Sequence, residues 1–169
     1  MAFVEIEQKY RLKDAAKIRA QLAGMGAKRI ASGLELNEFY DRGDFLKKQK
    51  VALRLRRFGK PPALLTLKGP RIRNKFTKRM EIETPIAYKT AKGILDFLGC
   101  RVVRKYSKRR ELYRLGMVHV TVDFLKQFGW FLEIEGRPQG IRKIEKKLGL
   151  TGADREERSY LQMMFGWKH

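Results

Sequence analysis

The sequence has little cysteine and little histidine, which narrows the chemistry open to it. Cys100 is the single cysteine, so no internal disulfide can form, and this fits a reducing compartment. The two histidines, His119 and His169, are too few for a histidine-rich metal site. Nothing indicates a Ser-His-Asp or Cys-His catalytic set, and the G-x-x-x-x-G-K-[ST] phosphate loop is absent.

Long apolar runs are also missing. No stretch reaches the roughly 18 apolar residues that a membrane-spanning helix needs, and the start of the chain lacks the charged-then-apolar layout of a signal peptide. We therefore expect a cytoplasmic, soluble protein with no membrane partner. The 169 residues, 43% of them hydrophobic, are enough for one domain with a buried core, so we expect a single domain over residues 1–169.

Acidic residues are scarce. There are 18 Asp and Glu against 39 Lys and Arg, which gives a formal net charge of +21. Such an imbalance indicates a polyanionic partner, either a phosphate-rich small molecule, polyphosphate, nucleic acid or an anionic membrane. For many of the lysines, a solvated basic surface is explanation enough.

A recurring alternation of charged and apolar residues is the strongest pattern present. In a strand over 3–12, Glu5, Glu7 and Lys9 would share one face, and apolar side chains would share the other. The same alternation returns within 53–56, 65–68, 79–83, 120–123 and 131–135. Charged faces of both signs in one chain favour an α+β fold. In it, a sheet closes into a barrel with a charged, wet interior, and its apolar exterior packs against helices.

The expected helices cover about 15–25, 86–98, 140–148 and 154–165. Pro85 would open the second of them, with Ile94, Leu95 and Leu98 on its buried side. Segments 51–58 and 63–68 are expected to form a hairpin. The register of the strand over 101–115 has two alternatives. Either Lys108 and Arg110 face inward together, or Lys105, Arg109 and Glu111 do.

Two Glu-x-Glu pairs, Glu5/Glu7 and Glu133/Glu135, lie on the first and nearly the last strand, which meet when a sheet closes. Several carboxylates around one point suit a hard divalent cation such as Mg²⁺ or Mn²⁺. The alternative is that each pair is a salt-bridge partner of nearby arginines. With Asp123, Glu81 and Glu83 also facing inward, the metal interpretation is favoured.

The inward cations would serve a different purpose. The side chains that would share the interior with Lys9 are Arg54, Arg56, Lys68, Arg79 and the Lys108–Arg110 region. A row of such groups suits a linear chain of phosphates, because Arg binds phosphate oxygens in pairs and Lys supplies a point charge. Mutual neutralisation across the barrel is the alternative. Because the cations outnumber the carboxylates, we expect an anionic ligand.

Taken together, these residues resemble the CYTH family, also called triphosphate tunnel metalloenzymes. Glu5-x-Glu7-x-Lys9 is similar to the family's E-x-E-x-K signature. The further matches follow in the family's order and cover nearly the whole chain: Tyr40-Asp41, Leu53-Arg54-Leu55-Arg56, Thr66-Leu67-Lys68-Gly69-Pro70, Arg79-x-Glu81-x-Glu83, Lys108-x-Arg110, Asp123 and Gly129-x-Phe131-x-Glu133-x-Glu135.

The resemblance implies an eight-stranded closed antiparallel barrel that binds a triphosphate and one or two divalent metal ions. By this resemblance the metal ligands would be Glu5, Glu7, Asp123, Glu133 and Glu135. The substrate-binding residues would be Lys9, Arg54, Arg56, Lys68, Arg79, Glu81, Glu83, Lys108 and Arg110. Catalytic roles would belong to Lys9, Glu7 and Asp123. The stretch Gly69-Pro70-Arg71-x-Arg73-x-Lys75 looks most like class IV adenylyl cyclases.

Three functions follow as alternatives. The first is metal-dependent conversion of ATP to cyclic AMP and pyrophosphate. The second is hydrolysis of inorganic triphosphate (tripolyphosphate) or thiamine triphosphate, since the same cradle serves both reactions. The third is a non-catalytic module that binds polyphosphate, nucleotide or RNA; a nucleic-acid partner is not favoured, because a pure binder has no need of inward carboxylates. The oligomeric state is left open, with a homodimer among the options.

Overall fold

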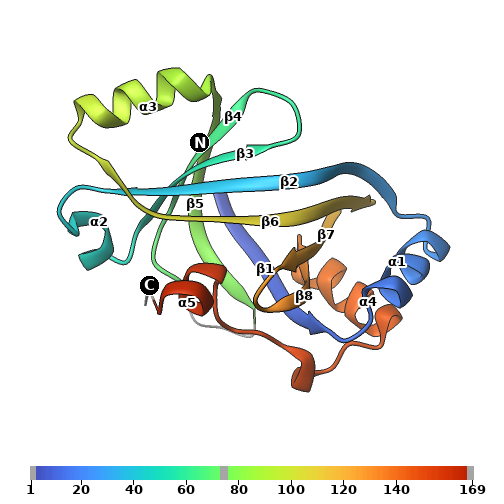
Figure 1. Ribbon diagram of the computed structural model, residues 1–169. Coiled ribbons are helices and arrows are strands. Elements are labelled where there is room, and N and C mark those ends of the chain that lie inside the picture. Colours follow the sequence, from blue (N-terminus) through green and yellow to red (C-terminus); the bar gives the residue numbers. More distant parts are fainter. Residues whose placement is uncertain (1–2, 73–75, 167–169) are drawn as a thin grey trace.

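Eight strands form one closed antiparallel barrel in the order β1-β5-β4-β3-β2-β6-β7-β8. The computed structural model describes residues 3–72 and 76–166. Figure 1 shows the long strands β2 and β6 running side by side across the barrel. The strands are β1 (Phe3–Leu12), β2 (Lys28–Asp41), β3 (Ala52–Phe58), β4 (Ala63–Lys68), β5 (Thr77–Ile86), β6 (Arg101–Leu115), β7 (Val118–Leu125) and β8 (Gly129–Glu135). The predicted barrel is confirmed.

The barrel closes where β1 pairs with β8. In this seam Lys9 lies opposite Glu133, and Glu7 lies opposite Glu135. On its other edge β1 pairs with β5, so that Glu5 lies opposite Arg79. Because side chains alternate along a strand, Glu5, Glu7 and Lys9 of β1 point into the barrel. There they lie beside the charged side chains of the residues paired with them on β5 and β8. The seam therefore brings charged residues of the first and the last strand together in one interior.

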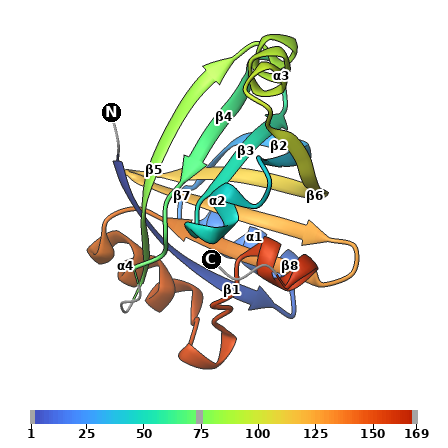
Figure 2. The ribbon, with the colours of Figure 1, turned by 90° about the vertical axis from the view of Figure 1, so that its left-hand side faces the viewer.

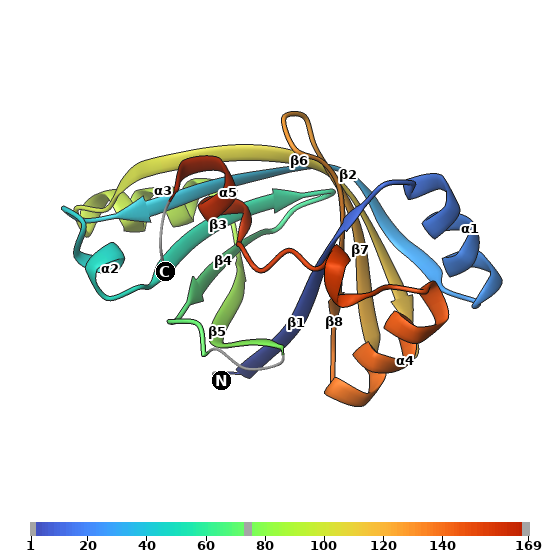
Figure 3. The ribbon, with the colours of Figure 1, turned by 90° about the horizontal axis from the view of Figure 1, so that it is seen from below.

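Helices cover the outside of the barrel at opposite sides. They are α1 (Ala15–Gly24), α2 (Phe45–Lys48), α3 (Tyr88–Phe97), α4 (Pro138–Leu148) and α5 (Tyr160–Phe165), with a short 3-10 helix, η1 (Gly152–Asp154). Ile18 and Leu22 of α1 and Ile141 and Ile144 of α4 are buried in one apolar cluster with outward residues of β7 and β8. Ala91 and Leu95 of α3 form a second cluster over β3 and β4. The view from below shows α1 and α4 on one side and α2 and α3 on the other (Figure 3).

Helix α5 lies across one end of the barrel. Tyr160 and Leu161 pack there with Phe39, Ala52 and Tyr106, which come from β2, β3 and β6. The segment that follows α4 thus returns to the barrel and covers this end, as the side view shows (Figure 2). This arrangement was not predicted. A continuous helix over 154–165 was expected, but the chain makes η1, then an extended stretch, then α5. The helix starts late because Ser159 caps it, accepting from the backbone of Gln162.

The second expected helix also begins later than predicted. Pro85 still belongs to β5, and α3 starts at Tyr88 after the extended Ala87. Its buried side is formed by Ala91 and Leu95, whereas Ile94 and Leu98, predicted as buried, are about half exposed. Pro85 misled the prediction because a proline that ends a strand gives the same signal as one that starts a helix. The predicted helices over 15–25 and 140–148 agree with α1 and α4 to within two residues.

Strand β6 has the first of its two predicted registers. Lys108 and Arg110 are buried inside the barrel, while Lys105 and Arg109 are exposed outside. The alternation predicted within 79–83 lies on β5, which starts at Thr77. Arg73 and Lys75, which belong to the class IV-like stretch, and His169 lie outside the described residues.

Candidate active site: a charged cavity inside the barrel

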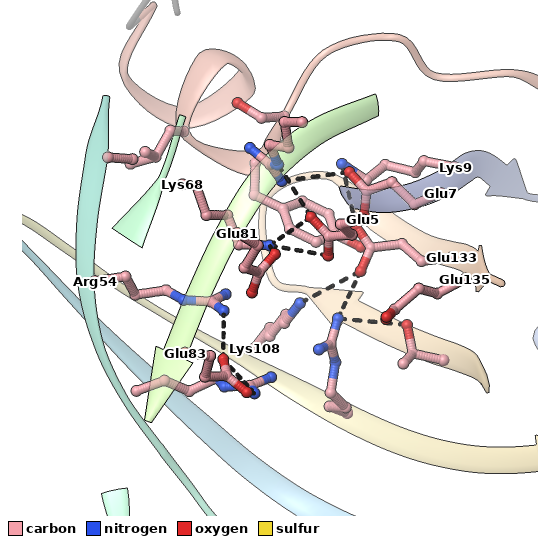
Figure 4. Close-up of a pocket in the computed structure, with 18 of the residues that line it drawn as sticks. Glu5, Glu7, Lys9, Arg54, Lys68, Glu81, Glu83, Lys108, Glu133 and Glu135 are labelled. Carbon is pink, nitrogen blue, oxygen red and sulfur yellow. Dashed lines mark hydrogen bonds and ion pairs between the residues drawn. The ribbon is translucent and has the colours of Figure 1, made fainter. Parts of the chain in front are cut away.

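The barrel holds a cavity of about 160 Å³ lined mostly by charged side chains (Figure 4). Its walls hold eight cations, namely Lys9, Arg54, Arg56, Lys68, Arg71, Arg79, Lys108 and Arg110. They also hold six carboxylates, namely Glu5, Glu7, Glu81, Glu83, Glu133 and Glu135. With the exception of Asp123, every residue that the sequence predicted for the site lines this one space.

One part of the cavity is acidic and belongs to β1, β5 and β8. Lys68 Nζ lies 2.9 Å from Glu5 Oε2 and 2.6 Å from Glu81 Oε2. Arg79 Nε donates to Glu5 over 3.1 Å, and Arg79 also reaches Glu7 at 3.4 Å. Burial opposes the ionisation of Glu81, but the Lys68 ammonium outweighs it and holds the pKa of Glu81 below its usual value. Two cations therefore hold three carboxylates together.

Glu135 stands beside these carboxylates on β8. Desolvation in the cavity, together with the negative charges of Glu5, Glu7 and Glu81, outweighs the Lys68 ammonium and raises the pKa of Glu135 to about 7. Figure 4 shows Glu135 on the same side of the cavity as Glu133. A carboxyl that resists ionisation because other carboxylates face it indicates a place where a cation would be stabilised.

The donors in this part of the cavity fit a hard divalent ion, since they are carboxylate oxygens without thiols. The raised pKa of Glu135 is the observation that supports the fit. As placed, no three acidic, histidine or cysteine side chains within 3–72 and 76–166 are arranged to hold a metal ion. Glu5, Glu7 and Glu81 face Lys68 and Arg79 instead, so ion binding would require some of them to leave these partners.

The centre of the cavity is a cationic group around Glu133. Its carboxylate accepts from Arg110 Nη2 at 2.6 Å and lies 3.3 Å from Lys9 Nζ. Burial opposes its ionisation, but Lys108, Lys9 and Arg110 together hold the pKa of Glu133 well below its usual range. Burial likewise lowers the pKa of Lys9, an effect that Glu133 partly offsets. Lys9 Nζ also donates to the carbonyl of Arg158 and lies over the ring of Tyr160.

Asp123 lies behind this group rather than on the cavity wall. It is fully buried and accepts from Lys108 Nζ at 2.9 Å, from Arg110 through two nitrogens at 2.7 and 2.6 Å, and from the Tyr160 hydroxyl at 2.8 Å. The sequence predicted it as a metal ligand with a catalytic role. In the structure both of its oxygens contact the two cations that face the cavity and hold them in place.

Glu35 has the same kind of position and was not predicted. It is fully buried on β2, 3.4 Å from Lys108 Nζ and 3.2 Å from Arg110 Nη1. These cations, with Arg56, outweigh burial and keep the pKa of Glu35 below its usual value. The signal was present in the sequence, since Glu35 and Asn37 alternate with Leu34 and Leu36 in the same way as the other charged pairs.

The third part of the cavity is formed by β3, β4 and β5. Glu83 lies 3.2 Å from Arg56 Nη2 and 3.7 Å from Arg54 Nη2, and it accepts from the hydroxyl of Thr66. Arg54 and Arg56 have no other carboxylate within reach in the described residues except Glu35, which lies 3.6 Å from Arg56. In this part, too, the cations on the cavity wall outnumber the carboxylates, by Arg54 and Arg56 to Glu83.

Arg71 and Tyr160 are two further lining residues that the site prediction missed. Arg71 precedes β5, donates to the carbonyl of Glu157 at 2.5 Å and reaches Glu7 at 3.8 Å. Tyr160 places its ring beside the ammonium groups of both Lys9 and Lys108, at 4.0 and 4.3 Å. Each depends on the return of the C-terminal segment across the barrel end, for which the sequence gives no periodic signal.

The cavity as a whole is close to electrically balanced. Eight cations face six carboxylates on its walls, and Glu35 and Asp123 lie behind Lys108 and Arg110 and complete the pairing. The excess of cations that the sequence suggested for the interior thus disappears once the two buried acids are included. None of the helices in the described part of the chain is long and apolar enough to cross a membrane.

Comparisons with known proteins agree with this architecture. The CYTH domain matches residues 4–160. Adenylate cyclase CyaB of Aeromonas hydrophila is 28% identical, over 92% of this chain and 86% of that protein. Among solved structures, the PH1819 protein of Pyrococcus horikoshii OT3 is 30% identical with a TM-score of 0.78, covering 97% of this chain and 99% of that one.

A plant protein shares the fold at greater distance. HpAC1 from Hippeastrum, which is described as having a dominant triphosphatase activity, superposes with a TM-score of 0.72 at 16% identity, over 98% of this chain and 97% of that one. The CYTH match extends from β1 to the first residue of α5 and includes every strand of the barrel. The chain therefore belongs to the CYTH domain family.

Proposed function

We propose that the protein is a divalent-metal-dependent enzyme that acts on a triphosphate-bearing substrate inside the barrel, with ATP as the first candidate. The observation that carries the proposal is the cavity inside the barrel, in which eight cations and six carboxylates are sorted into an acidic part and cationic parts. Membership of the CYTH family supports metal dependence, and relatives named adenylate cyclase support a nucleotide substrate.

Glu5, Glu7 and Glu135, with Glu133 beside them, would hold a Mg²⁺ or Mn²⁺ ion, which when bound neutralises phosphate charge and polarises a phosphoryl oxygen. The phosphate chain would lie along Lys9, Lys108 and Arg110 and extend toward Arg54 and Arg56. Because the walls are nearly neutral, a bare triphosphate would meet repulsion from the carboxylates. The near neutrality supports entry of the phosphate chain together with its divalent cation.

The fixed cations are the groups that favour the transition state. Asp123 and Glu35 hold Lys108 and Arg110 in place from behind, so these charges need no rearrangement when negative charge builds up on the reacting phosphoryl group. Asp123 thus acts as a positioning residue. Lys9, held between Glu133 and the Tyr160 ring, would neutralise charge at the other side of the same group.

In the cyclase reaction, the 3′-oxygen of ATP forms a bond to the α-phosphorus, the bond from this phosphorus to the bridging oxygen breaks, and pyrophosphate leaves. The 3′-hydroxyl loses its proton to a base or to water. The nucleoside would need a less polar surface than the phosphates. Phe39, Ala52, Tyr106 and Leu161 supply one at the end of the cavity beneath α5.

Triphosphatase activity is the second candidate, and the likeness to HpAC1 favours it. Here a water oxygen forms the bond to the terminal phosphorus, the bridging oxygen leaves with the diphosphate product, and the water loses a proton. Inorganic triphosphate or thiamine triphosphate would be the substrate. The same cations would stabilise this reaction, because both reactions gather negative charge around one phosphorus.

The deciding experiment incubates the protein with ATP, tripolyphosphate and thiamine triphosphate, each with Mg²⁺ or Mn²⁺, and separates the products. Cyclic AMP with pyrophosphate supports the cyclase, and orthophosphate supports the triphosphatase. Tight metal-dependent binding without any product would show a non-catalytic module and refute the enzyme proposal. A reaction that proceeds equally well in excess chelator would refute metal dependence.

Strand β6 offers a matched pair of variants for this test. Lys108 points into the cavity with a side chain that is 2% exposed, and Lys105 on the same strand points outward with 63% exposed. Lys108→Met should reduce turnover by about 100-fold or more, because a fixed positive charge near the phosphoryl group is lost. Lys105→Met should leave turnover within about twofold. Equal losses in both variants would show that the reaction does not occur in the barrel.

A further inference from the structure

The outer surface of α4 is a continuous basic stripe that the cavity does not use. Arg142, Lys143, Lys146 and Lys147 are all exposed, and the N-cap residue Arg137 is exposed as well. The four residues within the helix lie at intervals of three and four, so they share its solvent side. Residues on the opposite side, Ile141, Ile144 and Leu148, are buried in the core.

Helix stability does not account for this stripe. Positive charge is favourable only near the C-terminus of a helix, where Lys146 and Lys147 lie, and the first turn has no acidic residue to offset Arg137. The pairs Arg142/Lys146 and Lys143/Lys147 are like charges four residues apart, about 6 Å along the axis, and such pairs destabilise a helix by roughly 0.2–0.5 kcal/mol each. The like-charge pairs of the stripe therefore lower the stability of the helix.

No carboxylate compensates for it from the same surface. In the part of the chain that the structure describes, none of Arg137, Arg142, Lys143, Lys146 and Lys147 takes part in an ion pair. The acid of α4, Glu145, is directed to the hydroxyl of Tyr10 and to Arg155. Arg142 lies beside the ring of Phe76 and still leaves its charge exposed. An outside anion is the remaining partner for these charges.

The helix holds the stripe in a fixed position on the barrel. A Cβ at Gly140 would come within 2.6 Å of a methyl group of Val118, so glycine is required for α4 to lie this close to the start of β7. Arg114 and Lys28, opposite each other on β6 and β2, are exposed near the same end of the barrel. Together these groups present a rigid basic surface rather than scattered flexible lysines.

We propose that the α4 stripe binds a chain of phosphate groups, a nucleic-acid backbone or inorganic polyphosphate, separately from the cavity. The exposed side of α4 carries no large apolar side chain, so it offers nothing to insert into a lipid bilayer. It also carries no aromatic ring on which a base could stack, which points to contact with the backbone and no dependence on base sequence.

The test measures binding of a fluorescently labelled DNA duplex, a labelled single-stranded RNA and inorganic polyphosphate to the full chain over a range of salt concentrations. The variant K143A/K146A/K147A removes three charges of the stripe. The matched control K60A/K89A/K92A removes three exposed charges from the hairpin β3–β4 and from α3, so that the net charge falls equally. Melting temperature and triphosphate turnover are measured for both variants, and neither should change turnover.

The stripe variant should bind at least about tenfold more weakly than the parent at about 0.1 M salt, and the control no more than about threefold. For duplex DNA, the slope of log affinity against log salt should fall by about 2–3, close to 0.9 per charge removed. A loss of affinity for all three polymers would show that the stripe recognises the phosphate chain they share. A loss of affinity for only one of them would identify that polymer as the ligand.

Three outcomes would overturn the proposal. Equal weakening in both variants would mean that net charge alone attracts the polymer. Complete displacement of the polymer by ATP with Mg²⁺ would mean that it occupies the cavity. Competition by anionic phospholipid vesicles or by polyglutamate as effective as that by polyphosphate would mean that the surface does not recognise a phosphate chain.

Discussion

The inside and the outside of this barrel carry similar residue types but handle charge in opposite ways. Inside, each cation of the cavity lies near at least one carboxylate, and Glu35 and Asp123 complete the pairing from behind. Outside, 25 of the Lys and Arg residues in the described ranges are exposed, against six exposed carboxylates, of which Glu83 and Glu135 belong to the cavity. The net charge of the chain therefore resides on its surface.

This difference follows from the cost of burying charge. An unpaired buried ion is strongly destabilising, so the interior charges are each given a partner by the strand register. A surface cation is hydrated and screened, and it needs no partner to be tolerated. Net charge and site charge are thus separate quantities in this protein. The properties of the cavity depend on how its ion pairs are arranged, and those of the surface depend on its excess of positive charge.

The largest effect is expected from removing one interior charge in the reaction path. Glu133→Gln should lower metal-dependent turnover by about 100-fold or more, because Glu133 is the carboxylate on which Lys9 and Arg110 converge. The same change should lower the free energy of unfolding by only about 1–2 kcal/mol. Steady-state kinetics over a range of metal concentrations, with thermal melting, measures both. Unchanged turnover at saturating and at limiting metal would contradict the role given to Glu133.

Two aspartates test the cost of burial directly. Asp123→Asn removes the carboxylate that lies nearest to Lys108 and contacts Arg110 through two nitrogens, leaves only Glu35 and Glu133 to neutralise these buried cations, and should cost about 3 kcal/mol of unfolding free energy. Asp96→Asn removes a carboxylate that pairs with Arg101 on the surface and should cost less than about 0.5 kcal/mol. Urea denaturation of both variants provides the comparison. Similar costs would mean that the interior is as well hydrated as the surface.

Replacing Glu135 should change the unfolding free energy in the opposite direction, toward higher stability. Its pKa is raised to about 7, so between about pH 5 and 7 the folded protein keeps a proton that the unfolded chain releases, and stability falls as pH rises through this range. Without metal, Glu135→Gln should therefore raise unfolding free energy at pH 8 by about 1 kcal/mol and leave it unchanged near pH 4. Melting curves in chelator at both pH values measure this. If the gain in unfolding free energy were the same at both pH values, repulsion among the carboxylates could not be its cause.

The smallest effect is expected from salt. Raising NaCl from about 0.05 to about 0.5 M should increase the melting temperature by a few degrees, because screening relieves repulsion among exposed cations such as those of α4. Sodium perchlorate and sodium sulfate at equal ionic strength serve as controls for specific anion binding. A melting temperature that falls with salt would mean that interior pairs, rather than surface repulsion, dominate the electrostatic energy.

The barrel and most of its site were predictable because a strand alternates strictly. Once Glu5, Glu7 and Lys9 are placed on one face, the pattern is local and needs no knowledge of distant contacts. The same rule placed Arg54, Lys68 and Glu81 correctly on the cavity wall.

Alternation gives the direction of a side chain but not its depth. It could not show that Asp123 lies behind Lys108 and Arg110 instead of beside the other carboxylates. Tyr160 comes to the cavity on a C-terminal segment with no periodic pattern, whose position depends on tertiary packing alone, and Arg71 contacts the Glu157 carbonyl of the same segment. The late start of α3 has a similar origin, since Pro85 is compatible with either a strand end or a helix start.

The seam between β1 and β8 has a consequence for biosynthesis. The first strand to leave the ribosome must wait for the last strand before the barrel can close, so no earlier portion of the chain can complete the wall formed by Lys9 and Glu133. Until then the paired charges of β1 lack half of their partners, and such long-range closure is the slow part of folding. A nascent or truncated chain would consequently lack the closed cavity, which would form in one step once the last strand is in place.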